Sequence, residues 1–318
     1  MDRADLQPRV RDVAGAIETM ETRGAANIAD AAADALRAQA DGSEAETAAA
    51  LLAELRAVAR LLLATRPTAV SLPNACRYVL RRTGGDSVEA VRASAVESVA
   101  EFRARLETAQ RDLGQVGANR LRDGDTIMTH CHSTDALACV EAAVDDGKAL
   151  TALVKETRPR KQGHITAREL TELGVDVTMV VDSAARRYMN EVDHVLVGAD
   201  AIAADGSVVN KIGTSGLAVV ARERGTPVVV AAGTLKLDPA TMTGNAVEIE
   251  MREESEVLDE TEREAIGDIS VENPAFDVTP PRYVDAIVTE RGQFPPESIV
   301  TLMRELFGEG PTEPWQEP

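Results

Sequence analysis

The sequence predicts an α/β protein in two parts: a helical domain over residues 1–118 and a domain built on a parallel sheet over residues 119–318. Three observations carry this prediction. Alanine-rich stretches with apolar residues three and four positions apart fill the first third of the chain. Short β-branched runs begin near Arg122, and helical stretches separate most of them. Such alternation is typical of a parallel sheet with helices on both faces.

The first third predicts three helices separated by short turns. Glycine and proline end helices, so Asp41-Gly42, Arg66-Pro67-Thr68 and Gly84-Gly85 mark the breaks. The predicted helices are Asn27–Ala40, Ser43–Thr65 and Ser87–Val116. The last of them is long, because nothing interrupts its pattern between Val88 and Leu113.

The remaining chain predicts six strands and four helices in a Rossmann-like order. The strands are Thr126–His130, Ala149–Lys155, Val175–Val181, His194–Val197, Val228–Ala231 and Val284–Thr289. The helices are Ser133–Asp145, Ile165–Leu173, Ser183–Val192 and Ser215–Arg224. In such a sheet the ligand crevice lies beyond the carboxyl ends of the strands, so the residues that follow each strand are the candidate site.

The charge balance excludes one class of function and favours one environment. The chain carries 53 acidic and 34 basic side chains, a net charge of −19, which argues against nonspecific binding of nucleic acid. Only five of the basic residues are lysines, and acid-rich, lysine-poor surfaces are typical of a salt-loving cytoplasm because salt screens their repulsion. A GC-rich genome is the alternative explanation, since it also favours arginine over lysine.

The remaining composition favours a cytoplasmic protein. No window approaches eighteen uncharged apolar residues, and the amino terminus lacks the basic-then-apolar pattern of a secretory signal, so we expect no membrane partner. Three cysteines are too few for a disulfide framework and favour a reducing compartment.

A cysteine follows the first predicted strand, in the segment His130–Ser133. Strand alternation puts His130 and His132 on one side and Cys131 on the other, which disfavours a zinc site. Ser133 opens the next helix, whose N-terminus would favour a thiolate and bind phosphate. The alternative for Cys131 is a buried structural thiol.

A basic loop, Glu156–Gly163, follows the second strand. Three of its eight residues are basic in a strongly acidic chain, which indicates anion capture, with arginine offering two parallel hydrogen bonds. A solvated loop of salt bridges is the equally supported alternative.

Asp200 follows the fourth strand, where apolar neighbours could raise its pKa for acid–base work. Further on, Gly213–Gly216 opens a helix whose N–H groups could hold a phosphate together with Lys211. Lys236 adds a cation after the fifth strand. The spacing fits neither a dinucleotide fingerprint nor a P-loop. The residues therefore indicate chemistry on a small phosphorylated metabolite.

Several segments are similar to the signature of the eukaryotic initiation-factor-2B-like superfamily. They are G-A-D-A-I at Gly198–Ile202, D-G-S-V-V-N-K-I-G-T at Asp205–Thr214, E-T-R-P at Glu156–Pro159 with Gln162-Gly163, and R-G-A-A at Arg23–Ala26. The resemblance runs from about Arg23 to Phe307. The superfamily holds regulatory subunits of the translation factor, methylthioribose-1-phosphate isomerases and archaeal ribose-1,5-bisphosphate isomerases.

Within that superfamily the chain resembles the ribose-1,5-bisphosphate isomerases of salt-loving archaea. The segments that carry this closer resemblance are His130–Thr134, Arg66–Asn74 and Lys236. The methylthioribose enzymes resemble N-x-G-x-L-A-T-x-G instead, and noncatalytic subunits usually lack the cysteine–aspartate pair. Those two groups remain the alternatives.

The resemblance implies an aldose–ketose isomerase with Cys131 as base and Asp200 as acid. It implies that the substrate is held by Arg23, Gly24, Ala25, Ala26, Arg66, Ser133, Arg158, Asn210, Lys211 and Lys236. The reaction is an internal proton shift, so we expect neither metal nor redox cofactor. The resemblance also implies a homodimer or homohexamer and a role in AMP metabolism and pentose-phosphate salvage.

Overall fold

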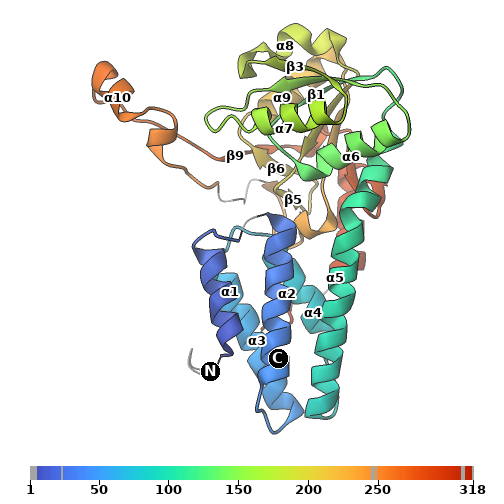
Figure 1. The fold of residues 1–318 in the computed structure, drawn as a ribbon, viewed down its shortest axis with the longest axis vertical. Coiled ribbons are helices and arrows are strands. Elements are labelled where there is room, and N and C mark those ends of the chain that lie inside the picture. Colours follow the sequence, from blue (N-terminus) through green and yellow to red (C-terminus); the bar gives the residue numbers. More distant parts are fainter. Residues whose placement is uncertain (1–5, 23, 245–246, 248, 309–311, 317–318) are drawn as a thin grey trace. The chain divides into compact units, whose positions relative to one another are not determined.

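The computed structural model describes residues 6–22, 24–244, 247, 249–308 and 312–316 (Figure 1). The chain separates into two compact units. A helical unit comprises residues 1–109, 235–237 and 303–318, and a sheet unit comprises residues 110–234 and 238–302. The expected boundary at residue 118 differs from this division, because α5 (Val88–Ala118) begins in the helical unit and ends in the sheet unit.

The helical unit is built from α1 (Pro8–Glu18), α2 (Ala25–Gly42), α3 (Ala48–Thr65), α4 (Ser71–Arg82) and the first part of α5. Apolar side chains of all five helices form one core. The helix predicted from Ser43 begins five residues later, because the Thr47 side chain accepts a hydrogen bond from the Ala50 N–H and caps α3 there. Two of the five helices, α1 and α4, were not predicted from the sequence, and they are the shortest of the five.

One buried arginine attaches the C-terminal segment to the helical unit. Arg77 on α4 is 3% exposed and forms an ion pair of 2.6 Å with Glu313. Its guanidinium also lies 5.1 Å from the centre of the Phe307 ring and 5.4 Å from that of Trp315. A desolvated, bidentate arginine stacked on aromatic rings explains why the chain returns to this unit.

The sheet unit contains a seven-stranded sheet in the order β11-β10-β7-β4-β1-β2-β3. Its strands are β1 (Thr126–Thr129), β2 (Thr151–Lys155), β3 (Asp176–Val180), β4 (His194–Gly198), β7 (Val228–Ala231), β10 (Ala286–Thr289) and β11 (Gly292–Phe294). All pairs are parallel except β10 with β11. The predicted α/β class is confirmed.

The order of the strands creates a switch point between β1 and β4. From β1 the chain steps to β2 and β3 in one direction, and from β4 it steps to β7 and β10 in the other. Right-handed crossovers therefore put α6 (Thr134–Asp145) and α7 (Gly163–Glu172) on one face, and α8 (Ala185–Tyr188) and α9 (Thr214–Arg224) on the other. The crevice of such a sheet lies at this switch point.

A small antiparallel sheet, which the sequence analysis did not predict, lies within the same unit. Its order is β8-β5-β6-β9, with β5 (Ala201–Ala203), β6 (Val208–Lys211), β8 (Leu237–Asp238) and β9 (Phe276–Thr279). Between β8 and β9 the chain forms an arm that bears α10 (Glu260–Ile266) and projects from the sheet unit (Figure 1). α11 (Ile299–Phe307) follows β11. No helix among the described residues is both long and apolar enough to span a membrane.

Candidate active site

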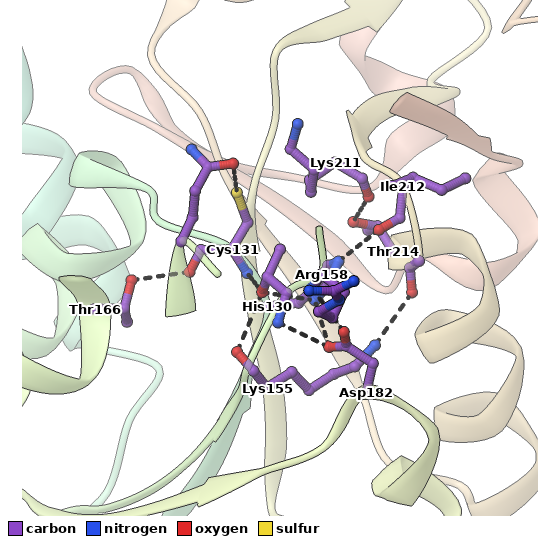
Figure 2. A network of polar contacts seen from close by, with 12 residues as sticks. His130, Cys131, Lys155, Arg158, Thr166, Asp182, Lys211, Ile212 and Thr214 are labelled. Carbon is purple, nitrogen blue, oxygen red and sulfur yellow. Dashed lines mark hydrogen bonds and ion pairs between the residues drawn. The ribbon is translucent and has the colours of Figure 1, made fainter. Parts of the chain in front are cut away.

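Cys131 lies two residues beyond β1, at the switch point of the large sheet (Figure 2). Its φ of 70° is in the left-handed region, where a residue with a side chain is rarely found. This turn ends the strand and leads the chain into α6. The thiol points toward the amide of Gln162, with Sγ 3.5 Å from Oε1. Since an amide oxygen only accepts, the thiol donates in this contact.

The expectation that the N-terminus of α6 makes Cys131 a thiolate is wrong for this structure. Burial raises the pKa of the thiol, and the negative charge of Asp200 acts in the same direction. A backbone hydrogen bond from His132 and the charge of Lys211 lower the pKa but do not outweigh burial. Cys131 is therefore a neutral thiol here, in agreement with the hydrogen bond that it donates to Gln162.

Asp200 lies two residues beyond β4, the strand beside β1. Its backbone N–H donates to the Val209 carbonyl at 2.8 Å, which ties the G-A-D segment to β6. The side chain interacts electrostatically with Cys131 and Lys211. Asp200 is exposed, so the expected apolar pocket around its carboxyl group is wrong.

The glycine that begins this segment, Gly198, is required by Ser133. The Ser133 hydroxyl caps α6 by accepting from the Ala136 N–H at 3.2 Å. A β-carbon on Gly198 would lie 2.2 Å from the Ser133 Oγ, which is far closer than real atoms approach. The start of α6 and the end of β4 thus fit together only with glycine at this position.

Lys211 and Asn210 are both buried at the end of β6. Burial lowers the pKa of Lys211, while the negative charge of Asp200 raises it. The Asn210 side chain donates to the Thr214 hydroxyl at 3.0 Å and so supports the first turn of α9. The positive charge of Lys211 therefore acts on both Cys131 and Asp200.

The N-terminus of α9 is occupied by a carboxylate, so the phosphate site expected there is wrong. Asp277 on β9 accepts the Gly213 N–H at 2.7 Å and the Ser215 N–H at 3.1 Å. These are the free donors that a phosphate would need. The prediction failed because β9 brings in a residue more than sixty positions away.

A shallow hollow that is open to solvent lies in the sheet unit beside Lys211. Its lining includes the side chains of Arg158, Arg160, Gln162, Lys211, Arg252 and Asn273. Arg252 lies near Lys211, since its charge lowers the pKa of that lysine. Glu256 also lines this hollow and pairs with Arg160, so the four cationic residues leave an excess of positive charge that suits an anionic ligand.

In the basic loop between β2 and α7, some residues form salt bridges, and one residue is placed to bind an anion. Arg160 forms an ion pair of 2.5 Å with Glu256, and Lys161 and His164 lie 3.8 and 3.4 Å from Glu156. These contacts match the salt-bridge interpretation. Arg158 fits the anion-capture interpretation better, because it lines the hollow. Its backbone N–H donates to Asp182, which fixes its position in the loop.

His130 is buried and lies within a network of polar contacts (Figure 2). Burial and then the charge of Lys155 lower its pKa to about 4. Its Nε2 lies 2.8 Å from the Ile212 carbonyl oxygen, so this nitrogen carries the proton and Nδ1 accepts. His132 contacts the Thr166 hydroxyl at 3.2 Å.

The other predicted binding residues belong to the helical unit. Gly24, with φ of 83°, precedes α2, and Ala25 and Ala26 are its first two residues. Arg66 follows α3 directly. Lys236 ends a short helical turn that Asn74 holds by donating to the Leu235 and Leu237 carbonyls, both at 2.8 Å. Arg23 lies outside the described residues.

Four residues of this region were missed by the sequence analysis: Thr157, Thr166, Asp182 and Arg252. Thr157 lies inside the quoted E-T-R-P segment, which was a usable signal. The other three come from α7, the end of β3 and the arm before β9, and no local pattern distinguishes them.

Comparisons with known proteins agree with the superfamily resemblance. Residues 21–296 match the model of the Initiation factor 2 subunit family. The chain is 72% identical to the ribose 1,5-bisphosphate isomerase of Haloferax volcanii, over 98% of this chain and 97% of that protein. It is 65% identical to the ribose 1,5-bisphosphate isomerase of Haloterrigena turkmenica, over 98% of each.

Solved structures share the fold over most of the chain. The translation initiation factor eIF-2B of Pyrococcus horikoshii OT3 matches with a TM-score of 0.76 and 29% identity, over 93% of this chain and all of that one. The 5-methylthioribose 1-phosphate isomerase of the same organism matches with a TM-score of 0.71 and 34% identity, over 94% and 87%. Because a translation factor and an isomerase both match, fold alone does not define an activity.

Proposed function

The chain belongs to the initiation factor 2 subunit family, and from this premise we propose that it is an aldose–ketose isomerase that converts ribose 1,5-bisphosphate to ribulose 1,5-bisphosphate. The observation that carries the proposal is the meeting of a thiol, a carboxylate and a lysine at the switch point of the sheet. Relatives named for this activity, at 72% and 65% identity, support it.

The substrate explains why two proton-transfer groups are needed. Its anomeric oxygen carries a phosphate, so the ring does not open to a free aldehyde. In our proposal Asp200 protonates the ring oxygen as the bond between C1 and that oxygen breaks. At the same time Cys131 removes the proton on C2, which leaves an enol phosphate. The thiol then returns its proton to C1, and the 2-hydroxyl proton returns to Asp200 as the ketone forms. At the end of the reaction Cys131 and Asp200 have regained their starting protonation states.

The proposal requires one proton to move from Cys131 to Asp200 before the reaction begins. Cys131 holds it as a neutral thiol in the free structure, whereas the proposed reaction starts with a thiolate and a protonated Asp200. The two forms differ only in the position of that proton, so the titration belongs to the pair. Lys211 and the His132 N–H favour the thiolate, and a bound phosphate together with exclusion of water raises the pKa of a carboxyl group.

We assign substrate binding to two groups of residues. In the sheet unit these are Ser133, Arg158, Asn210 and Lys211. Of these four, Arg158 and Lys211 line the hollow, whose excess of positive charge supports an anionic ligand. In the helical unit they are Arg23, Gly24, Ala25, Ala26, Arg66 and Lys236, which rest on the resemblance. Two groups suit a bisphosphate, because each phosphate needs its own donors.

One assay tests the proposed function. The purified protein is incubated with ribose 1,5-bisphosphate, with methylthioribose 1-phosphate and with ribose 1-phosphate, and each ketose is measured. We expect turnover of the bisphosphate with a kcat/KM at least about 100-fold above ribose 1-phosphate, since each lost charged contact costs about 1.5–3 kcal/mol. Preference for methylthioribose 1-phosphate would assign the other isomerase activity. No turnover of any of the three would favour a regulatory subunit.

The proposal includes a homo-oligomer in the cytoplasm of a salt-loving cell and a role in AMP metabolism and pentose-phosphate salvage. The three cysteines of the chain are free and buried, which suits a reducing compartment. Exposed apolar side chains on and beside the arm, such as Met242, Met251 and Ile266, suit a surface that a second copy covers. Light scattering in concentrated KCl that gives a mass of a single 33.8 kDa chain would overturn the assembly.

A further inference from the structure

We propose that Thr157 and Thr166 are positioning residues for Cys131, and that their hydroxyls hold the strained backbone conformation from which its thiol acts. The claim that the two threonines support the action of the thiol rests on the proposed isomerase activity. The structural claim, that the two hydroxyls determine where the thiol lies, is independent of any substrate.

Cys131 needs such support because its backbone is strained. With φ of 70° it occupies the left-handed region, where the β-carbon approaches the following carbonyl oxygen. Strain of this kind persists only where surrounding contacts hold it, and it is concentrated at functional sites. Released from those contacts, Cys131 would relax toward the extended conformation of β1, and the thiol would move.

Both backbone polar groups of Cys131 are held by threonine side chains (Figure 2). Its N–H donates to the Thr157 Oγ1 at 2.9 Å, and its carbonyl accepts from the Thr166 Oγ1 at 2.8 Å. The two threonines come from the β2–α7 loop and from α7, so the cysteine is gripped from two directions. Thr157 and Thr166 are 1% and 2% exposed, so bulk water does not replace a lost hydroxyl.

Thr157 is itself held in a strained conformation. Its φ is 67°, and its N–H and that of Arg158 donate to the two oxygens of Asp182 at 2.9 and 2.8 Å. Asp182 follows β3, the edge strand of the sheet. One carboxylate therefore holds the turn that presents the Thr157 hydroxyl.

The histidine proton of this network has one consistent position. His130 carries its proton on Nε2, which donates to Ile212, so its Nδ1 accepts. The Thr157 hydroxyl accepts from Cys131, and its own proton points to the His130 Nδ1 at 3.2 Å or to the Lys155 carbonyl at 3.1 Å. A valine at position 157 keeps the shape of threonine and removes the hydrogen bonds that the Thr157 hydroxyl makes.

The conformation of Cys131 also sets the surroundings of its sulfur. Gln162 in the same loop accepts from the thiol at 3.5 Å, and the charge of Lys211 lowers the thiol pKa. A shift of about 1 Å in the reacting group can reduce turnover about 100-fold, although the residues that bind substrate are unchanged. Loss of either hydroxyl should therefore lower kcat and leave KM nearly constant.

The experiment compares Thr157→Val and Thr166→Val with Thr157→Ser and Thr166→Ser. Serine keeps the hydroxyl and loses only a methyl group. Thr171→Val is the matched control, because Thr171 is also on α7 and its hydroxyl donates to the Ala167 carbonyl of the same helix. Two properties are measured: kcat and KM with ribose 1,5-bisphosphate, and the rate at which iodoacetamide alkylates Cys131 between pH 6 and 10, followed by peptide mass spectrometry.

We expect each valine variant to lower kcat at least about 10-fold with KM within about twofold of wild type. We expect alkylation of Cys131 at pH 8 to rise at least about threefold, because the relaxed thiol leaves its buried position. The serine variants and Thr171→Val should stay within about threefold of wild type in both measurements. Cys76 and Cys139 provide an internal reference, because burial raises the pKa of each to about 12.

Three results would overturn the inference: valine variants with the kcat and alkylation rate of wild type, serine variants that lose as much as valine variants, or an effect confined to KM. If Thr157→Val does not fold, Thr166→Val and Asp182→Asn decide the question by the same readouts. If ribose 1,5-bisphosphate is not a substrate, the alkylation rates still test the two hydroxyls, so failure of the proposed function is distinguishable from failure of this inference.

Discussion

The carboxylate of Asp277 accepts the backbone N–H of Gly213 at 2.7 Å, and through this bond β9 closes the N-terminus of α9. Gly213 has φ of 99°, and a β-carbon there would lie 3.1 Å from the His130 Nε2. Glycine is thus required both by the backbone conformation and by the approach of the histidine ring. The segment that carries Lys211 is fixed between these two neighbours.

Asp277→Ala should lower the free energy of unfolding by about 1–2 kcal/mol, because two helix N–H groups lose their acceptor. Urea unfolding followed by circular dichroism measures this change. Asp259→Ala is the matched control: Asp259 caps α10, an exposed helix of seven residues, and should change the main transition by less than about 0.5 kcal/mol. Equal effects of the two substitutions would contradict a structural role for Asp277.

Stability should fall as the pH falls from about 6.5 to about 4, because His130 is buried as a neutral ring. Its pKa is lowered to about 4, so the unfolded chain binds this proton first as acid is added. The histidine contributes its full stability above pH 6.5, and about 3 kcal/mol is lost by pH 4. Urea unfolding at a series of pH values measures the slope.

His130→Gln should flatten that slope, since glutamine keeps a donor for the Ile212 carbonyl and does not titrate. His164→Gln, which removes a histidine that is 52% exposed, serves as the control and should leave the slope close to that of wild type. A wild-type slope in the His130 variant would mean that other groups cause the acid sensitivity.

Cys131→Ser should abolish turnover while the fold is retained, because a serine hydroxyl is far less acidic than a thiol and does not act as the base. In the wild type, burial raises the pKa of this base, so kcat/KM should increase with pH through the neutral range into the alkaline range. A pH–rate profile measures both. Turnover near the wild-type level in the serine variant would remove Cys131 from the mechanism.

Asp200→Asn should lower kcat by at least about 100-fold and leave KM nearly unchanged, because the amide keeps the size of the side chain and loses the proton donor. Steady-state kinetics with ribose 1,5-bisphosphate separate the two parameters. Asp205→Asn is a suitable control, because Asp205 lies in the nearby turn and accepts the Ser207 N–H at 2.9 Å. An increase in KM alone would make Asp200 a binding residue.

The melting temperature should rise by more than about 5 °C between low salt and concentrated KCl, because screening reduces the repulsion among side chains with a net charge of −19. Differential scanning calorimetry measures it. Sucrose at the same osmotic pressure is the control, since it excludes itself from protein surfaces without screening charge. A protein equally stable without salt would contradict the salt-loving interpretation.

Sequence alone determined the class of the fold and the positions of six of the seven strands of the large sheet; β11, of three residues, was not predicted. The predicted strands are short β-branched runs bounded by turns, and period and length are local properties that a sequence displays. The same local patterns identified Cys131 and Asp200. Both residues follow such runs, and the ends of neighbouring parallel strands meet at one edge of the sheet. Local patterns did not reveal α4 or the small antiparallel sheet, whose strands are two to four residues long.

Only the tertiary structure decided the electrostatic state of these residues. Cys131 is a neutral thiol and Asp200 is exposed, although the sequence suggested a thiolate and an enclosed carboxyl group. Asp277 occupies the helix terminus that was expected to bind phosphate. Burial and charge depend on groups that are distant in the chain and near in space, and a pKa responds to all of them at once. The sequence therefore identified which side chains are present, and folding determined how each of them is charged.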